Sequence, residues 1–293
     1  MTIFSQDKLA QYTTFRIGGP ARALFISRSA EDVIEAINKA KSTSLAWRVI
    51  GHGSNILAAD KSLGSAIIVF KDSSSPQIQE NGDIVVSGGY PLSGLAIYLA
   101  SKGLGGLENL AGIPGTVGGA IVGNAGAYGS AIGDAVKNVS LINKAGKILE
   151  AGADMLKFSY RHSRLKETGE TVLKATIRTT QCESEKLHKI IETRLADRLQ
   201  KHPDYREFPT AGSFFKNPMG TDGRPTSAGQ LLQEAGCKTL RVGGAYVWPK
   251  HANIIVSDGK ATAEDVLRLS AEMKARVKKL FGIELEQEVC FLE

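Results

Sequence analysis

Several features that mark whole classes of protein are missing from this chain of 293 residues. Its three cysteines (Cys182, Cys237, Cys290) are an odd number without a Cys-x-x-Cys pair, which disfavours a disulfide framework and indicates a reducing compartment. No apolar run reaches the roughly 18 residues expected of a membrane span. Residues 1–16 lack the apolar core of a signal peptide. We therefore expect a cytoplasmic protein, and we see no metal-ligand spacing.

The sequence also lacks a long block of residues with the same charge. The chain has 36 Lys and Arg against 30 Asp and Glu, a net charge of +6, and no run of five or six basic residues. This mild excess falls short of a nucleic-acid-binding tail, and most of it is explained by solvated surface. It is compatible with a small phosphorylated ligand. We expect neither a nucleic acid nor a membrane as partner.

Glycine, in contrast, is abundant and unevenly placed. There are 32 glycines, and 11 of them lie among the 31 residues from Gly103 to Gly133. They follow no three-residue period, which excludes collagen, and they alternate with apolar residues, which disfavours a flexible linker. A glycine inside a regular element costs about 1 kcal/mol relative to alanine. Two explanations stay open: backbone amides that line an anionic cofactor, or a tightly packed core rich in turns.

The order of the predicted elements indicates an α+β protein of two or three domains. The first 70 residues suggest a small α/β unit, residues 135–180 are rich in strands, and an α/β pattern returns after a break near residue 182. Capping pairs begin two of the helices, at Ser29 with Asp32 and at Thr262 with Asp265. Predicted strands are 23–27, 66–70, 84–89 and 252–256; predicted helices follow Ser29, end at Gly103, span 184–200 and run from 262 to Gly282.

Two glycine motifs suggest anion binding. Gly51-His52-Gly53-Ser54-Asn55 lies between two apolar runs, where a turn either exposes amides to an anion or simply joins two strands. It is neither a dinucleotide fingerprint nor a P-loop, because the third glycine and the Gly-Lys-Ser/Thr sequence are missing. Gly112 to Ala120, continuing to Gly129, is harder to explain as an ordinary turn.

Polar residues suggest further chemistry. Arg161, after an aromatic residue, is able to pair with a carboxylate or phosphate, although a surface position is the plainer interpretation. Ser213, between a glycine and two phenylalanines, is able to donate a proton or to form a turn. Glu284, Glu286 and Glu288 share one face of an extended segment. Such a face is usually solvated, and one of its carboxylates could reach a site.

Taken in order, the motifs resemble one family closely, the UDP-N-acetylenolpyruvoylglucosamine reductases. The matching pieces cover nearly the whole chain, and the two most specific are IPGTVGGA with NAGAYG (113–129) and AGSFFKNP (211–218). The others are TTFRIGGPA (13–21), GHGSN (51–55), FSYR (158–161), KHAN (250–253) and ELEQEV (284–289).

The resemblance implies a fold and a reaction. Two subdomains of the vanillyl-alcohol-oxidase-like (PCMH) type, placed at residues 1–70 and 71–181, bind FAD non-covalently. A C-terminal α/β domain at 182–293 binds the substrate. NADPH reduces the flavin, which reduces UDP-N-acetylglucosamine enolpyruvate to UDP-N-acetylmuramate for peptidoglycan precursors. Only 52 positions of sequence separate Arg161 from Ser213. This leaves no room for the substrate-capping insertion of the longer subtype, so the resemblance implies the shorter, type II form. We also expect a monomer.

Residue roles also follow from the resemblance. Ser213 matches the proton donor, Arg161 the arginine that polarises the substrate carboxylate, and Glu288 the third catalytic residue. Lys201, Asn217 and His251 match positions that contact the substrate. The implied flavin contacts are Gly51, His52, Gly53, Ser54, Asn55, Gly112, Ile113, Pro114, Gly115, Thr116, Gly118, Gly119, Ala120, Asn124 and Gly126.

Two departures and two alternatives remain. Trp248 stands where the family has small polar residues, and Gly123 stands where a larger residue is common. One alternative is an oxidase of the same flavin fold, although the pattern around His52 does not match a covalent flavin tether. The other is a nucleotide-sugar sensor without catalysis, which the presence of Arg161, Ser213 and Glu288 disfavours.

Overall fold

The structure is a computed structural model that describes residues 2–4, 7–220 and 225–293. The chain divides into two compact units, each described here by itself. Unit 1 comprises Met1–Ser5, Ala23–His52 and Gly64–Arg198, and unit 2 comprises Gln6–Arg22, Gly53–Leu63 and Leu199–Glu293. Both combine sheets with helices, so the predicted α+β class is confirmed. The finer boundaries at residues 70 and 181 stay a prediction.

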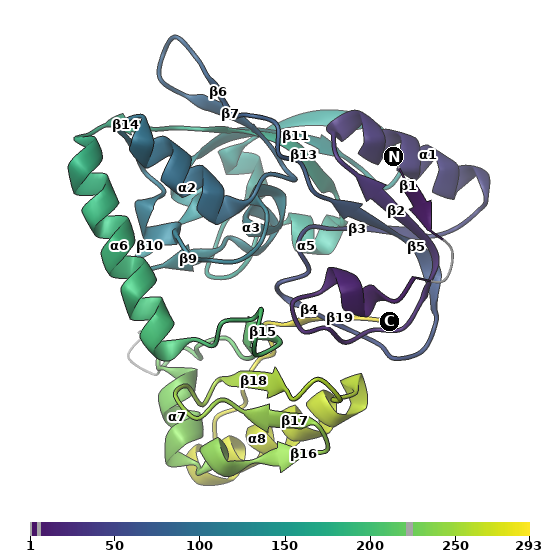
Figure 1. Cartoon of the computed structure of the whole chain (residues 1–293), viewed down its shortest axis with the longest axis vertical. Helices are drawn as coiled ribbons and strands as arrows, with labels where there is room; N and C mark the ends of the chain where they lie inside the picture. The colour runs from purple at the N-terminus through teal and green to yellow at the C-terminus, as the bar shows by residue number, and fades with distance from the viewer. Residues whose placement is uncertain (1, 5–6, 221–224) are drawn as a thin grey trace. The chain divides into compact units, whose positions relative to one another are not determined.

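Two larger sheets form the frame of unit 1 (Figure 1). One has the order β1-β2-β5-β3 and the other β12-β11-β13-β7-β6. Residues 66–70 of β5 are buried without interruption, as expected of a strand covered on both faces. The strands of these sheets are β1 (Thr2–Phe4), β2 (Ala21–Ser27), β3 (Trp47–Ile50), β5 (Leu63–Phe70), β6 (Gln77–Ile78), β7 (Ile84–Ser87), β11 (Val136–Ile142), β12 (Ile148–Gly152) and β13 (Thr171–Ile177).

Helix α1 (Ala30–Ser42) begins where the sequence predicted. The Ser29 hydroxyl accepts the amide of Asp32 at 3.1 Å, which satisfies one of the unpaired amides of the first turn. Val33 and Ile37 lie fully buried on the face that packs against the first sheet. Capping and burial of an apolar stripe therefore stabilise the same helix.

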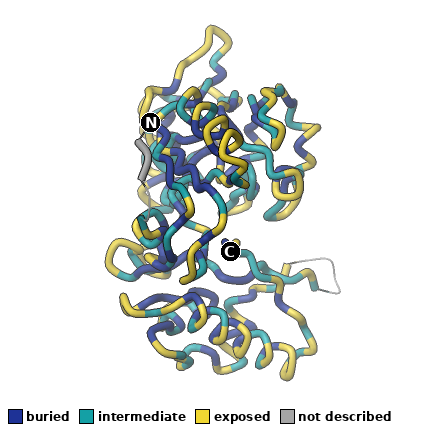
Figure 2. Tube along the Cα trace, turned by 90° about the vertical axis from the view of Figure 1, so that its right-hand side faces the viewer, coloured by how far each residue is buried: buried dark blue, intermediate teal, exposed yellow. Residues whose placement is uncertain are grey.

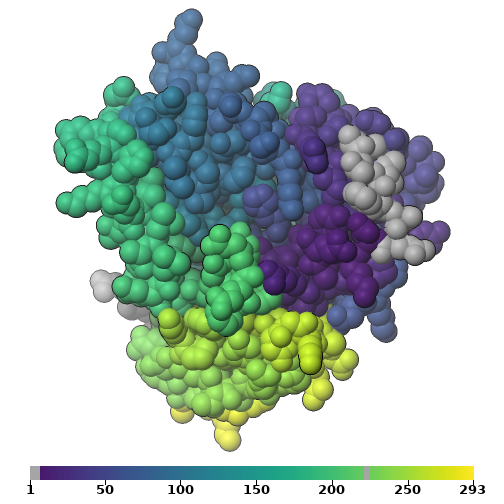
Figure 3. Space-filling view, viewed as in Figure 1, coloured from purple at the N-terminus to yellow at the C-terminus, as the bar shows by residue number. Residues whose placement is uncertain are grey.

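The remaining elements of unit 1 surround the second sheet. Leu92 and Leu95 of α2 share a hydrophobic core with Leu187 and Ile191 of α6. The turn between β6 and β7 projects from the unit (Figures 1 and 3) and is exposed (Figure 2). These elements are α2 (Leu92–Ser101), β8 (Leu104–Gly105), η2 (Glu108–Leu110), α3 (Val117–Gly123), β9 (Gly126–Ala127), β10 (Ser130–Ala131), α4 (Ile132–Ala135), η3 (Ala153–Leu156), α5 (Leu165–Thr168), β14 (Thr180–Gln181) and α6 (Ser184–Lys201).

Helix α3 lies inside the glycine-rich stretch, where the sequence did not predict a helix. The Thr116 hydroxyl accepts the amide of Gly119 at 3.3 Å and caps its first turn. The Gly118 amide donates to Gly88 O at 2.8 Å. A Cβ on Gly118 would lie only 2.9 Å from that same oxygen. Glycine is needed here because two backbone segments touch.

Unit 2 is built on the sheet β15-β18-β17-β16, and α8 packs against β16 and β17. Val266, Leu269, Met273 and Val277 of α8 are fully buried, as the predicted spacing requires. Strand β19 pairs in parallel with β4. The elements of this unit are η1 (Leu9–Tyr12), β4 (Ile56–Ala58), β15 (Thr210–Ser213), α7 (Ala228–Glu234), η4 (Cys237–Thr239), β16 (Arg241–Val242), β17 (Ala245–Val247), β18 (Ile254–Ser257), α8 (Ala263–Phe281) and β19 (Cys290–Leu292).

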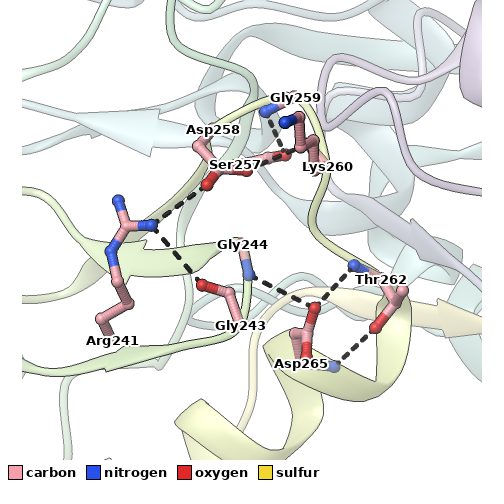
Figure 4. A network of polar contacts seen from close by, with 9 residues as sticks. All are labelled: Arg241, Gly243, Gly244, Ser257, Asp258, Gly259, Lys260, Thr262 and Asp265. Atoms are coloured by element: carbon pink, nitrogen blue, oxygen red, sulfur yellow. Dashed lines mark hydrogen bonds and ion pairs between the residues drawn. The ribbon is translucent and has the colours of Figure 1, made fainter.

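A network of polar contacts fixes the start of α8 (Figure 4). The Thr262 hydroxyl accepts the Asp265 amide at 3.1 Å, and the Asp265 carboxylate accepts the Thr262 amide at 3.0 Å. The same carboxylate accepts the Gly244 amide at 3.4 Å. Hydrogen bonds from backbone amides lower the pKa of Asp265. The predicted capping pair is confirmed, and it also ties the hairpin β16–β17 to the helix.

The close approach at Gly118 gives a direct test of the packing in unit 1. We expect Gly118→Ala to destabilise the protein by about 1–3 kcal/mol, because the new methyl group overlaps Gly88 O. Gly123→Ala is the matched control, since its added Cβ has no neighbour within 4 Å and alanine favours a helix. Urea unfolding measures both, and equal stability of the two variants would contradict the packing account.

Candidate active site

The predicted site residues fall into two groups, one in each unit. Arg161 and the glycine-rich stretch belong to unit 1, whereas Ser213, Glu288 and the three predicted substrate contacts belong to unit 2. The predicted loop 51–55 is divided, with Gly51 and His52 in unit 1 and its last three residues in unit 2. We describe each group within its own unit.

The structure brings two predicted flavin segments together in unit 1. Gly51 lies so close to Thr116 that a Cβ on this glycine would overlap the Thr116 hydroxyl. Gly115, which directly precedes Thr116, has a φ of +131°, a backbone conformation that residues with a side chain rarely adopt. The turn after β3 and the segment before α3 are therefore in direct contact.

Fewer backbone amides of the glycine-rich stretch are available to a ligand than the sequence suggested. Those of Gly112, Val117 and Gly118 donate to acceptors inside unit 1 at 2.8–2.9 Å. The Ile113 amide donates to Leu110 O at 3.1 Å and the Gly119 amide to the Thr116 hydroxyl at 3.3 Å. Within residues 112–119, the amides of Gly115 and Thr116 therefore have no acceptor among the described residues. Tight packing thus accounts for part of the glycine excess, and two consecutive amides are available to an anion.

Asn124 connects the end of α3 to the segment that carries Arg161. It adopts a left-handed conformation with a φ of +44°, and its side chain is buried. Its amide group donates to Ser159 O at 2.8 Å, and its side-chain oxygen accepts the Gly133 amide at 3.0 Å. Asn124 therefore acts on any ligand through the turn that it holds.

Arg161 lies at the tip of a tight turn between Ser159 and His162, whose backbones exchange two hydrogen bonds. Its φ is +53°, which costs a non-glycine residue on the order of 1 kcal/mol or more. The guanidinium donates to Gly126 O at 2.9 Å, and Lys166 Nζ donates to Arg161 O at 2.8 Å. The turn is thus strained and held from both sides, which orients the guanidinium.

Two arginines of α6 join this group, and sequence reasoning missed both. The Arg194 guanidinium stacks 4.1 Å from the ring centre of Tyr128, whose hydroxyl donates to Asp197 at 2.7 Å. Arg198 packs against Gly112. Burial lowers the pKa of Arg198, and the charge of Arg161 lowers it further. The available signal was their spacing of four residues, which places both on one helix face.

In unit 2, Ser213 ends β15 opposite Ile254 and is half-buried. Gly212, before it, has a φ of +78°, so the chain bends at this point. The next two residues, Phe214 and Phe215, are almost fully buried, and Asn253 binds the backbone of both at 2.8–2.9 Å. The serine is therefore anchored by its neighbours while its own side chain stays accessible.

Glu288 differs from the two acidic residues before it. Its amide donates to Phe214 O at 2.8 Å, which places it beside the Ser213 segment, and its side chain is half-buried. Glu284 and Glu286 are exposed and form ion pairs with Lys278 and Lys216 at 3.2 and 2.5 Å. The backbone of Glu286 is bonded to the same segment, through its carbonyl to the Lys216 amide at 2.8 Å, so the feature that sets Glu288 apart is its half-buried side chain.

The predicted substrate contacts show different environments. Burial lowers the pKa of His251, and nearby lysine charges, including that of Lys201, add to the effect. Asn217 accepts the amide of Ala228 at 3.0 Å, next to the start of α7. Trp248, the departure from the family pattern, packs its ring 4.9 Å from that of Phe208. Aromatic packing thus accounts for the tryptophan.

Comparisons with known proteins cover nearly the whole chain. Residues 21–152 match an FAD-binding domain, and residues 202–292 match the C-terminal domain of UDP-N-acetylenolpyruvoylglucosamine reductase. The reductase of that name from Heliobacterium modesticaldum is 39% identical over 97% of this chain and 88% of its own length. The one from Carboxydothermus hydrogenoformans is 39% identical over 98% and 93%.

A solved structure supports the same assignment. The UDP-N-acetylenolpyruvylglucosamine reductase of Thermus caldophilus superimposes with a TM-score of 0.82 at 31% identity, with both chains covered in full. Each of these alignments spans both the flavin-binding and the C-terminal portions, with an overall identity above 30%. This chain belongs to the UDP-N-acetylenolpyruvoylglucosamine reductase family.

Proposed function

We propose that this chain catalyses the NADPH-dependent reduction of UDP-N-acetylglucosamine enolpyruvate to UDP-N-acetylmuramate, a step toward peptidoglycan. The observation that carries the proposal is membership of the reductase family over almost the whole chain. We assign flavin binding to residues 1–70 and 71–181 and substrate binding to 182–293. In the part of the chain that the structure describes, no helix is long and apolar enough to cross a bilayer. We propose a cytoplasmic monomer.

The residues of unit 1 fit the diphosphate of FAD. The amides of Gly115 and Thr116 lack acceptors in the described chain, and α3 has no acidic residue in its first turn to repel an anion. Gly119 is exposed, and a Cβ there would meet only the Thr116 hydroxyl at 3.5 Å. We propose that the segments at Gly51 and at 112–120 hold the cofactor. The chemistry that bound FAD would supply there is hydride transfer from NADPH to the substrate double bond.

Arg161 supplies fixed positive charge for the reaction. Addition of hydride to an enol ether beside a carboxylate builds negative charge on the carboxylate side. A guanidinium that is already oriented stabilises that charge without reorganisation. The bonds to Gly126 O and from Lys166 hold Arg161 in this orientation, which supports its proposed role.

Ser213 and Glu288 complete the proposed chemistry. Ser213 donates one proton to the carbon that does not receive hydride. A hydroxyl is a weak acid, so a neighbouring ionisable group must assist it. Glu288 is our candidate, because its side chain is half-buried and its backbone amide donates a hydrogen bond to Phe214 O, in the residue after Ser213.

Replacing Ser213 separates an enzyme from a sensor. We expect Ser213→Ala to reduce product formation by about 100- to 10,000-fold, because the proton donor is lost. Reduction of the flavin by NADPH should remain close to that of the unchanged protein. Ser42→Ala, an exposed position at the end of α1, is the control. Unchanged turnover of Ser213→Ala in a steady-state assay would refute the proton-donor role.

The two C-terminal glutamates offer a matched pair. We expect Glu288→Gln to lower kcat more than tenfold, because assistance to Ser213 is worth at least that factor. Glu286→Gln removes only an ion pair whose carboxylate is exposed, so its kcat should stay within about twofold. Equal kcat values for the two variants would show that Glu288 does not assist Ser213.

The lowered pKa of His251 predicts a pH-dependent stability. Unfolding returns the imidazole to a pKa of about 6.5. The folded chain binds this proton less readily, so the stabilisation is complete above that pH and is lost as the pH falls toward the folded pKa. Relative to His251→Gln, the unchanged protein should lose free energy of unfolding between about pH 7.5 and 5.5. A constant difference in urea unfolding across this range would contradict the shift.

A further inference from the structure

We propose that a pocket in unit 1 binds a small anion that carries phosphate. Its volume of about 730 Å³ falls within the usual range for small-molecule sites. The end of α1, the start of β3, the turn between β11 and β12, and α5 contribute its walls. We call it the basic pocket, after the four cationic side chains among its lining residues, Lys41, Arg48, Lys144 and Lys166.

Charge in the basic pocket is unbalanced. Among the described residues, Glu167 is the one acidic residue that lines it. Its carboxylate points to a different partner, His162 Nε2 at 3.1 Å, and its side chain is 74% exposed. The four cationic residues are exposed as well, and their excess over the one lining carboxylate produces a positive potential at the cavity. None of these four residues belongs to the predicted flavin or substrate contacts, and Lys166 alone enters the reductase account, through its hydrogen bond to Arg161 O.

Backbone carbonyls hold three of the cations in place. Lys41 Nζ donates to Ala145 O at 2.5 Å, Lys144 Nζ to Trp47 O at 3.3 Å, and Lys166 Nζ to Arg161 O at 2.8 Å. The neutral carbonyl that binds Lys41 or Lys144 orients the ammonium group without cancelling its charge. Side chains that are ordered before binding lose less entropy when a ligand arrives, which favours affinity.

Lys144 contacts two other residues that line the pocket. Its ammonium lies 4.3 Å from the centre of the Trp47 ring, a cation–π contact. Gly169 makes room for it, because a Cβ there would lie 2.6 Å from Lys144 Cε. Desolvation lowers the pKa of Lys144, and the charge of Arg48 lowers it further. An anion between these two cations would relieve their repulsion.

The donor set selects phosphate chemistry. A phosphate group offers several charged acceptor oxygens, and it pairs both with ammonium groups and with the fork of a guanidinium. Ser44 adds a hydroxyl to the wall. Inorganic phosphate, pyrophosphate and phosphorylated metabolites share this chemistry. The lysine that holds Arg161 O also lines the pocket, so the ligand would bind next to the support of the Arg161 turn.

Tryptophan fluorescence tests the proposal at the pocket itself. The chain has two tryptophans, so Trp248→Phe leaves Trp47 as the reporter beneath Lys144. We would titrate this FAD-loaded variant with pyrophosphate and, separately, with inorganic phosphate at constant ionic strength. We expect saturable changes with both, and the tighter of the two shows whether one phosphate group or two fit. A response no larger than that to sodium chloride at matched ionic strength would overturn the proposal.

Calorimetry of pyrophosphate binding to the FAD-loaded protein assigns the residues. We expect Lys144→Met to weaken binding at least about tenfold, since a charged hydrogen bond is lost. Lys147→Met, an exposed lysine on the same turn that does not line the pocket, should bind normally. Loss of binding in Lys201→Met with full binding in Lys144→Met would place the anion at the proposed substrate site and refute the pocket. Because binding is read without turnover, that result would leave the reductase proposal intact.

Discussion

The contact between Gly118 and Gly88 O is the constraint on which unit 1 depends. It lets α3 start against the end of β7, with the Gly118 amide bonded to the same oxygen that excludes any side chain. From there the chain is fixed step by step. Asn124 follows α3 and holds Ser159 O, and the turn after Ser159 presents Arg161. A packing requirement between glycines thus sets the position of a proposed catalytic guanidinium.

Positive charge gathers near this turn at an energetic cost. Arg161 adopts a strained backbone conformation, and its charge lowers the pKa of the partly buried Arg198. Bringing two guanidinium groups together does not stabilise the folded chain. It does favour the binding of an anionic cofactor or substrate. The amides of Gly115 and Thr116, which lack acceptors in the described chain, are likewise unfavourable until an anion accepts from them. The paired guanidinium groups and these two amides both become favourable when the proposed diphosphate-bearing ligands bind.

Local signals in the sequence predicted local structure well. The capping pairs at Ser29 and Thr262 are confirmed, and Gly282 ends α8 in a left-handed conformation as expected. These features depend on residues a few positions apart. Helix α3 escaped prediction because three of its seven residues are glycine, so its stability comes from Thr116 and from packing rather than from helix propensity.

Long-range contacts were beyond the sequence. The parallel pairing of β19 with β4 joins residues more than 200 positions apart, and no periodicity encodes it. The half-buried side chain of Glu288, in contrast to the exposed one of Glu286, also depends on how this segment packs against distant residues, for example through the hydrogen bond from the Glu288 amide to Phe214 O. Family motifs named Arg161, Ser213 and Glu288, and their roles remain predictions. Arg198 belongs to no quoted motif, and its proximity to Gly112 becomes visible only in the fold.

The central claim is that this chain is a flavin reductase for an enolpyruvyl UDP-sugar. The most direct measurement is the visible absorbance of the purified protein during a titration with NADPH, followed by addition of UDP-N-acetylglucosamine enolpyruvate. The account predicts a yellow protein whose flavin band is bleached by NADPH and restored by the substrate without oxygen. A colourless protein that takes up no FAD, or a reduced flavin that the substrate fails to reoxidise, would contradict it.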